Sequence, residues 1–190
     1  MAQQLWLLRH GDAEPHGARQ DADRRLTAKG EKQARVAGEA MAKLGLEFAA
    51  VYTSPRVRAR DTARLAAKPL KADPMVHQPL TAGFDAEDAR TLLAAQGDDA
   101  RVLVVGHEPD FSQTVHDLTG GRIDLKKGGL AAVRLEGARV RCARRSFRLR
   151  SSGQLLQSDC KLGHHFAFPA YVPVGSPLRS INRRTEGSRA

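Results

Sequence analysis

The residues of this sequence that could do chemistry are two histidines and several arginines, each placed just after a short apolar segment. Arg9-His10 follows the first such segment, Arg58 comes shortly after a second, and His107 follows a third. Arginine guanidinium groups bind phosphate oxygens two at a time, and a neutral imidazole is nucleophilic near pH 7. If these residues lie together, the sequence predicts a pocket in which a histidine attacks phosphorus while arginines stabilise the phosphoryl charge.

The elements that must position these residues alternate along the chain. Strands are expected at 5–8, 48–53, 101–105 and 130–136, and the last of these is expected to be an outer strand. Helices are expected at 28–44, 55–67, 85–95 and 110–118. Thr27 and Ser54 are the expected N-caps of the first two helices. Alternating strands and helices predict an α/β fold, a three-layer αβα sandwich with a mostly parallel sheet. Ligands bind beyond the carboxyl ends of such strands, so residues about 100 positions apart would converge there.

Composition sets the broad class of the protein. The chain has 190 residues, of which 41% are apolar, and this length and content suit one globular domain with an appendage. No apolar run approaches the roughly 20 residues of a membrane-spanning helix, and the N-terminus does not resemble a signal peptide. Two cysteines give neither a disulfide framework nor a metal-binding spacing. We therefore expect a cytoplasmic protein with no membrane partner.

The net charge of +10 is concentrated at one end of the chain. Residues 1–137 contain 20 Lys and Arg against 19 Asp and Glu, whereas residues 138–190 contain 11 against two. Both cysteines and seven of the nine serines also lie in the second stretch. This abrupt change predicts a domain boundary near Gly137, with a catalytic domain over 1–137 and an irregular basic tail over 138–190 that is disordered or non-native, as a shifted reading frame would produce.

Four segments together resemble the motifs of one family. Leu7-Leu8-Arg9-His10-Gly11 is similar to the Arg-His-Gly signature of the histidine phosphatase (phosphoglycerate-mutase-like) superfamily. Residues 24–34 resemble the R-x-L-T-x-x-G-x-x-Q-A segment of that family, and residues 54–63 resemble its S-P-x-x-R-A-x-x-T-A helix. Residues 106–109 resemble its G-H-x-P segment. Within the superfamily, the Arg-His-Gly-Asp-Ala sequence and the short chain resemble the SixA-type phosphohistidine phosphatases.

The resemblance assigns roles to five residues. It implies that His10 is the nucleophile, that His107 is the second catalytic histidine, and that Arg9 and Arg58 bind the phosphate of the substrate. Arg24 matches a further family arginine that closes over the phosphate. Two histidines and several arginines, with no carboxylate at ligand spacing, make a poor metal site, so we expect no metal and no cofactor.

The proton donor of the larger family members has no clear counterpart. These proteins carry a glutamate or aspartate near residues 80–85, where this sequence has no glutamate. Asp85 is a possible substitute, although it equally suits the N-cap of the third helix. A missing acid favours phosphohistidine as substrate, because its P–N bond is labile and its imidazole protonates near neutrality. Arg56 has no motif counterpart and is expected to face solvent.

These observations predict a metal-independent phosphohistidine phosphatase that acts on a phosphorylated histidine of a signalling protein through a phospho-His10 intermediate. One alternative is a small-molecule phosphoester phosphatase of the same superfamily, with Asp85 or Glu87 as acid. Another is a non-catalytic protein that binds phosphate or nucleic acid through the basic tail; the nearly neutral charge of residues 1–137 disfavours nucleic acid. The oligomeric state stays open.

Overall fold

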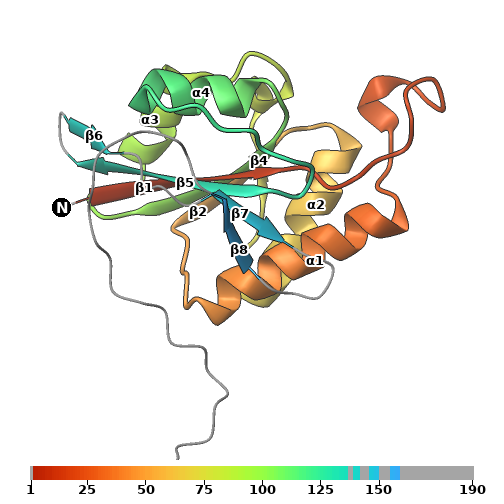
Figure 1. The fold of residues 1–190 in the computed structure, drawn as a ribbon, viewed down its shortest axis with the longest axis horizontal. Coiled ribbons are helices and arrows are strands. Elements are labelled where there is room, and N and C mark those ends of the chain that lie inside the picture. The colour runs from red at the N-terminus through yellow and green to blue at the C-terminus, as the bar shows by residue number, and fades with distance from the viewer. Residues whose placement is uncertain (1, 137–138, 142–145, 150–154, 159–190) are drawn as a thin grey trace, which may run out of the picture.

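The computed structural model describes residues 2–136, 139–141, 146–149 and 155–158. Strands and helices alternate through the first 136 residues, as the sequence predicts for an α/β fold (Figure 1). The strands are β1 (Ala2–Arg9), β2 (Ala50–Thr53), β3 (Met75–Val76), β4 (Arg101–Gly106), β5 (Leu130–Glu136), β6 (Arg139–Arg141), β7 (Ser146–Leu149) and β8 (Leu155–Ser158). The helices are α1 (Ala28–Lys43), α2 (Val57–Ala67), α3 (Ala86–Ala94) and α4 (Asp110–Thr119).

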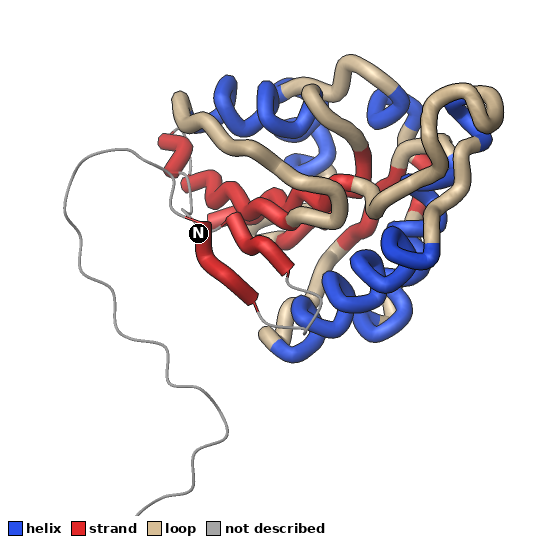
Figure 2. Tube along the Cα trace, turned by 45° about the vertical axis from the view of Figure 1, so that its right-hand side comes forward, coloured by secondary structure: helices blue, strands red, loops and turns tan. Residues whose placement is uncertain are grey.

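The strands form one sheet in the order β3-β2-β4-β1-β5-β7-β8, with β6 paired to β5. The strands β3, β2, β4 and β1 are parallel to one another, and β5 runs antiparallel to β1. Helices α1 and α2 cover one face of the sheet while α3 and α4 cover the other (Figures 1 and 2). The predicted three-layer αβα sandwich is confirmed.

The central strands are buried on both faces, which explains their continuous apolar sequences. Along β1, Leu5 and Leu7 pack in the hydrophobic cluster shared with α3 and α4, whereas Trp6 and Leu8 pack in the cluster shared with α1 and α2. Successive side chains of a strand point to opposite faces, so a strand covered on both sides needs apolar residues at every position.

The strand register brings the ends of three strands together. Arg9 of β1 is aligned with Gly106 of β4, so the residues that follow them, His10 and His107, leave neighbouring strands side by side. Thr53 of β2 is aligned with Val105 on the other edge of β4. The next residue, Ser54, continues this pairing by donating its amide to the Val105 carbonyl oxygen at 3.0 Å.

Several element boundaries differ from the sequence expectations. Helix α2 begins at Val57 with Arg56 as its N-cap, so Ser54 precedes the helix by three residues and is not its cap. Leu44, expected on the apolar face of the first helix, is 43% exposed because the helix ends at Lys43. Strand β3 is too short for a sequence pattern to indicate. Strand β5 is not an outer strand, since β7 pairs with it at Leu130 and Ala131.

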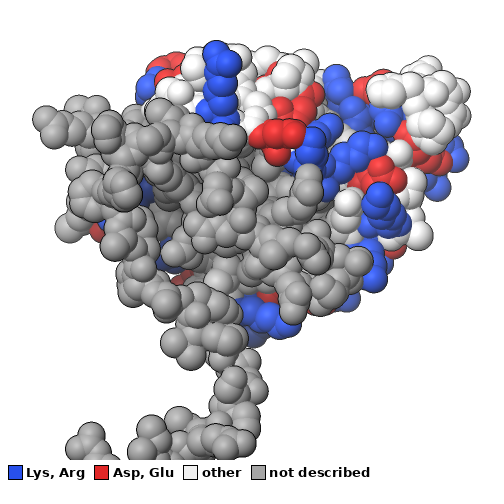
Figure 3. All heavy atoms as spheres, in the orientation of Figure 1, with Lys and Arg blue, Asp and Glu red and all other residues white. Residues whose placement is uncertain are grey.

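The tail expected to be irregular contains three short strands, β6 to β8, among the residues described. They continue the sheet beyond β5 by antiparallel pairing. The remainder of 138–190 lies outside the described residues, so the domain boundary and a nucleic-acid role for this tail stay predictions. Where described residues are visible in Figure 3, basic and acidic side chains are intermixed, and neither kind forms a patch of its own. No helix in the described part of the chain has the length and apolar character of a membrane span.

Candidate active site

The His10 imidazole lies at the end of β1 with its two ring nitrogens in different roles. Its Nδ1 is 2.7 Å from the carbonyl oxygen of Gly11, which can only accept, so Nδ1 carries the proton. Its Nε2 is 3.3 Å from Nε of Arg58, which donates to it. The imidazole is therefore neutral, with the lone pair of Nε2 turned toward the Arg58 guanidinium. A nucleophilic histidine needs this tautomer.

The ring of His107 lies against that of His10, with 5.1 Å between the ring centroids. Its Nε2 is 2.8 Å from the hydroxyl of Ser54, which is fully buried. The Ser54 oxygen also accepts the Arg56 amide proton at 3.3 Å, and Nε2 is the acceptor available to the hydroxyl proton among the described residues. This arrangement places the remaining ring proton of His107 on Nδ1, a buried atom with no hydrogen-bond partner in the described part of the chain.

Arg9 and Arg58 approach the two histidines from different elements. Arg58, in the first turn of α2, is only 4% exposed and points its Nε at His10. Arg9, the last residue of β1, donates from one terminal nitrogen to the Leu125 carbonyl oxygen at 2.7 Å. Its Nε is buried and has no hydrogen-bond partner within the described residues. Buried donors of this kind normally find partners in proteins, so Arg9 Nε and His107 Nδ1 suit an incoming anion.

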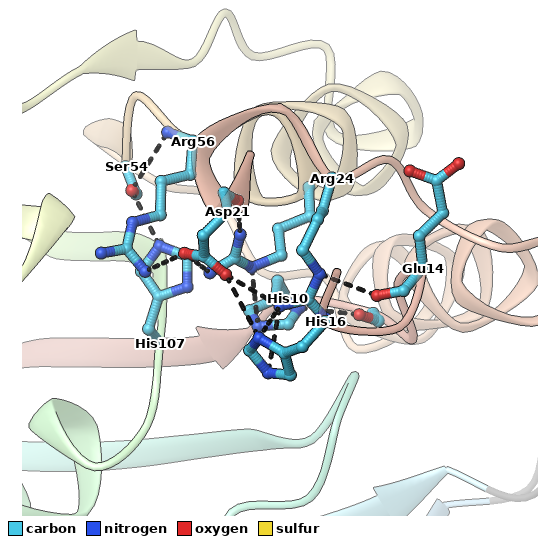
Figure 4. A network of polar contacts seen from close by, with 10 residues as sticks. His10, Glu14, His16, Asp21, Arg24, Ser54, Arg56 and His107 are labelled. Atoms are coloured by element: carbon cyan, nitrogen blue, oxygen red, sulfur yellow. Dashed lines mark hydrogen bonds and ion pairs between the residues drawn. The ribbon is translucent and has the colours of Figure 1, made fainter. Parts of the chain in front are cut away.

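Asp21 is a site residue that the sequence analysis missed. Its carboxylate forms ion pairs with three arginines: with Arg24 NH1 at 2.9 Å, with Arg56 NH1 at 2.9 Å and with Arg58 NH2 at 3.1 Å. Its main-chain oxygen also accepts from Arg58 NH1. Figure 4 shows the Asp21 side chain between those of Arg56 and Arg24. The only sequence signal was its position three residues before Arg24, in a polar segment without periodicity.

The arginine expectations have mixed outcomes. Arg24 is buried and its Nε donates to the Glu14 carbonyl oxygen at 2.7 Å, whereas its neighbour Arg25 is exposed, so the structure brings Arg24 to the site. The expectation that Arg56 faces solvent is wrong, because its side chain is only 26% exposed and pairs with Asp21. As the N-cap residue of α2, Arg56 lies beside the carboxylate.

Asp85 is engaged at the beginning of α3 and not with the histidines. Its Oδ1 accepts hydrogen bonds from the amides of Glu87 and Asp88 at 2.8 and 2.9 Å. In turn, Oδ2 of Asp88 accepts a hydrogen bond from the Asp85 amide. This reciprocal arrangement is a capping box. Glu87 lies on the exposed side of the same helix and pairs with Arg90. The capping interpretation of Asp85 accounts for its place in the sequence.

Two motif glycines allow the end of β1 to approach the start of α1. A Cβ on Gly11 would lie 2.5 Å from the carbonyl oxygen of Gly30, and a Cβ on Gly30 would lie 1.9 Å from that of Asp12. No other residue type fits at either position without moving the backbone. This close approach fixes the backbone of the loop that follows His10. In the same loop, the Asp12 carboxylate forms an ion pair with Lys127 at 2.7 Å.

Burial and neighbouring cations set the charge states of the site. Burial, assisted by Arg58 and Arg9, lowers the pKa of His10 to about 4 despite its hydrogen bond to Gly11. Burial, followed by the charges of His10 and the arginines, lowers the pKa of His107 to about 3. Although burial alone would raise it, the hydrogen bonds from Arg24 and Arg58 lower the pKa of Asp21 to about 2. At neutral pH both histidines are uncharged and Asp21 is a carboxylate.

The described residues contain no group of three or more His, Cys, Asp and Glu arranged to hold a metal ion. The site instead presents guanidinium groups and imidazole N–H, which are donors suited to an oxyanion. Its chemistry is that of phosphoryl binding and transfer.

Comparisons with known proteins agree with this geometry. Residues 5–81 match the histidine phosphatase superfamily (branch 1). An uncharacterized protein from Picosynechococcus is 35% identical over 145 residues, which are 72% of this chain and 88% of that protein. The solved structure of the protein histidine phosphatase SixA complexed with tungstate is 25% identical, with a TM-score of 0.62, and covers 82% of this chain and 94% of its own. A mycobacterial glucosyl-3-phosphoglycerate phosphatase shares the fold, with 18% identity, a TM-score of 0.60 and coverage of 75% and 98%.

The fold and the facing histidines thus define a phosphatase, and the chain belongs to the histidine phosphatase superfamily. Within that superfamily it falls in the SixA-like branch.

Proposed function

We propose that this protein is a metal-independent phosphohistidine phosphatase that uses His10 as its nucleophile. The observation that carries the proposal is the orientation of the His10 ring: Nδ1–H is fixed to the Gly11 carbonyl, and the Nε2 lone pair faces the guanidinium of Arg58 at 3.3 Å. A phosphoryl group held by that guanidinium lies next to the attacking atom.

The reaction has two steps. In the first, Nε2 of His10 forms a bond to phosphorus, the P–N bond of the substrate breaks, and the ring, which is protonated on its other nitrogen, leaves as neutral imidazole. In the second, water attacks the phosphorus of phospho-His10, the Nε2–P bond breaks, and phosphate leaves. Arg58, Arg9 Nε and His107 Nδ1 are the donors that would bind the phosphoryl oxygens and stabilise their charge in both transition states. On binding, the Nε–H of Arg58 would pass from His10 Nε2 to a phosphoryl oxygen and free the attacking lone pair.

The nature of the leaving group supports phosphohistidine over phosphoesters. An alkoxide leaves poorly without a proton donor, whereas an imidazole protonates near neutrality. Asp85, the residue expected at the donor position, caps α3. The physiological substrate that fits these properties is a phosphorylated histidine on a signalling protein.

A second candidate, a small-molecule phosphoester phosphatase, is favoured by one observation. Burial raises the pKa of Glu108, the residue after His107, although Ser112 and Arg9 oppose the shift. Its Oε1 is buried with no hydrogen-bond partner in the described part of the chain. A carboxyl group that keeps its proton to higher pH could protonate an alcohol leaving group.

Labelling and substrate preference test the proposal. Incubation with a ³²P-labelled phosphohistidine peptide should leave a protein label that survives alkali and is lost in acid. His10→Ala should abolish the label and the turnover, whereas His116→Ala, at an exposed position on α4, should change neither. EDTA should leave the rate unchanged.

The outcomes separate the candidates. A kcat/KM for phosphohistidine at least tenfold above that for aryl and sugar phosphates supports the proposed function. The reverse preference, lost in Glu108→Gln, selects the phosphoester phosphatase. A stable label in His10→Ala would contradict the assignment of the nucleophile.

A further inference from the structure

The carboxylate of Asp21 lies in an unusual position for an acidic side chain, among three arginines that otherwise suit a phosphoryl group. Both of its oxygens are used: Oδ1 pairs with Arg24, and Oδ2 pairs with Arg56 and Arg58. The main-chain and side-chain oxygens of Asp21 occupy the two terminal nitrogens of Arg58 and leave its Nε directed at His10. Asp21 is thus compatible with a phosphoryl group bound beside Arg58 Nε.

Side-chain exposure separates Asp21 from two buried groups, Arg58 and His10. The Asp21 side chain is 43% exposed, that of Arg58 is 5% exposed, and His10 is 7% exposed. In phosphoryl transfer the attacking and leaving atoms lie on opposite sides of phosphorus. Since Nε2 of the buried His10 attacks from the protein side, the leaving group lies on the solvent side, and the Asp21 side chain is more exposed than those of Arg24, Arg56 and Arg58.

The charge of Asp21 therefore bears on the leaving group. The ring of phosphohistidine carries positive charge while its other nitrogen is protonated, and it leaves as neutral imidazole, whereas the oxygen of an aryl or alkyl phosphate leaves with negative charge. A carboxylate on the leaving-group side attracts the cationic ring of the substrate and repels the negative charge that develops on the ester oxygen. It stays ionised throughout, since the arginines hold its pKa near the bottom of the range for aspartate.

We infer that Asp21 is a specificity-determining residue, whose negative charge among Arg24, Arg56 and Arg58 selects phosphoramidates with a protonated, cationic ring over phosphoesters. The inference rests on the proposed function, because it assumes attack by His10 on a phosphorylated imidazole. It assigns Asp21 to substrate discrimination and leaves the phosphoryl group itself to the arginines and His107.

The test compares two small substrates, free phosphohistidine and p-nitrophenyl phosphate, in the full-length protein. Asp21→Asn should lower the ratio of their kcat/KM values (phosphohistidine over p-nitrophenyl phosphate) about tenfold. This is the effect expected of one carboxylate charge that acts on the leaving group through partial screening by solvent. Asp21→Glu keeps the charge and should keep most of the preference. Asp23→Asn is the matched control, because Asp23 lies on the same 3₁₀ turn, Asp21–Asp23, and is exposed; its ratio should stay within twofold of wild type.

The possible results are distinct. A lower ratio in Asp21→Asn but not in Asp23→Asn supports the inference. An equal loss on both substrates means that Asp21 only holds the arginines in place, and it overturns the inference. If Asp21→Asn unfolds at a lower temperature than wild type, Asp21→Glu is the deciding variant. A phosphohistidine preference that is kept in Asp21→Glu supports the inference, and an equal loss on both substrates overturns it. Failure of the proposed function would show differently, as a wild-type protein that does not hydrolyse phosphohistidine.

Discussion

Replacing Ser54 by alanine tests how the structure sets the protonation of His107. The buried hydroxyl of Ser54 donates to His107 Nε2 at 2.8 Å, and this contact keeps the other ring proton on Nδ1. In Ser54→Ala the contact is lost, and the ring is free to carry its proton on Nε2. His107 would then present a lone pair, in place of a donor, to a phosphoryl oxygen.

The size of the effect follows from the energy of one hydrogen bond. A buried neutral hydrogen bond contributes about 1 kcal/mol, and this changes the ratio of the two His107 tautomers about fivefold. Complete loss of one oxyanion donor would cost about 100-fold in rate. Because only the tautomer population changes, we expect the rate of phospho-His10 formation to fall by at most about fivefold, with a loss of about 1 kcal/mol in the free energy of unfolding.

Rapid-quench measurement of the phosphoenzyme gives the rate, and long-range ¹H–¹⁵N NMR spectra of the ring nitrogens give the tautomer of His107. In a His107→Ala background, Ser54→Ala should cost less than twofold, because the hydroxyl then has no ring to orient. An unchanged His107 tautomer in Ser54→Ala, or the same loss of rate in the His107→Ala background, would refute the reasoning.

Three further predictions concern protonation, capping and packing. The pKa of His10 is about 4 in the folded protein and near 6.5 in an unfolded chain, so the unfolded state binds the proton first as the pH falls. The free energy of unfolding should therefore fall as the pH drops from about 6.5 to about 4. Urea denaturation should show a weaker fall in His10→Ala. Asp85→Ala should lower the free energy of unfolding by about 1 kcal/mol and leave kcat unchanged, and a loss of activity in the folded variant would restore its role as an acid. Gly30→Ala should lower the melting temperature in calorimetry, with a cost of about 2 kcal/mol, because its Cβ would lie 1.9 Å from the Asp12 carbonyl oxygen; a melting temperature equal to wild type would contradict the contact.

The sequence was informative where chemistry follows directly from secondary structure. The buried strands end at Arg9 and Gly106, and parallel pairing of neighbouring strands then brings His10 and His107 together without any knowledge of loops. The capping role of Asp85 was one of two predicted alternatives, because cap residues act on backbone amides two and three positions away.

The residues that the sequence analysis missed depend on tertiary contacts. Asp21 lies in a segment with no periodicity, and its partners Arg56 and Arg58 are more than 30 positions away. Ser54 was interpreted as a helix cap because Ser-Pro is a common start signal, yet the helix begins three residues later and the hydroxyl turns to His107. Strands of two to four residues such as β3 and β7 form by pairing with an existing edge, which no local pattern encodes.

The charges of the site are linked through the nucleophile. His10 must be uncharged to attack phosphorus, and burial together with Arg58 and Arg9 keeps its pKa near 4. Arg24 and Arg56 repel the positive charge of Arg58, and burial together with these two arginines lowers the pKa of its guanidinium. Asp21 relieves that repulsion, and because its carboxylate contacts the terminal nitrogens of Arg58, the Nε that faces His10 keeps its direction. One acidic side chain thus allows the pocket to be cationic enough to bind a phosphoryl dianion while the attacking imidazole remains neutral.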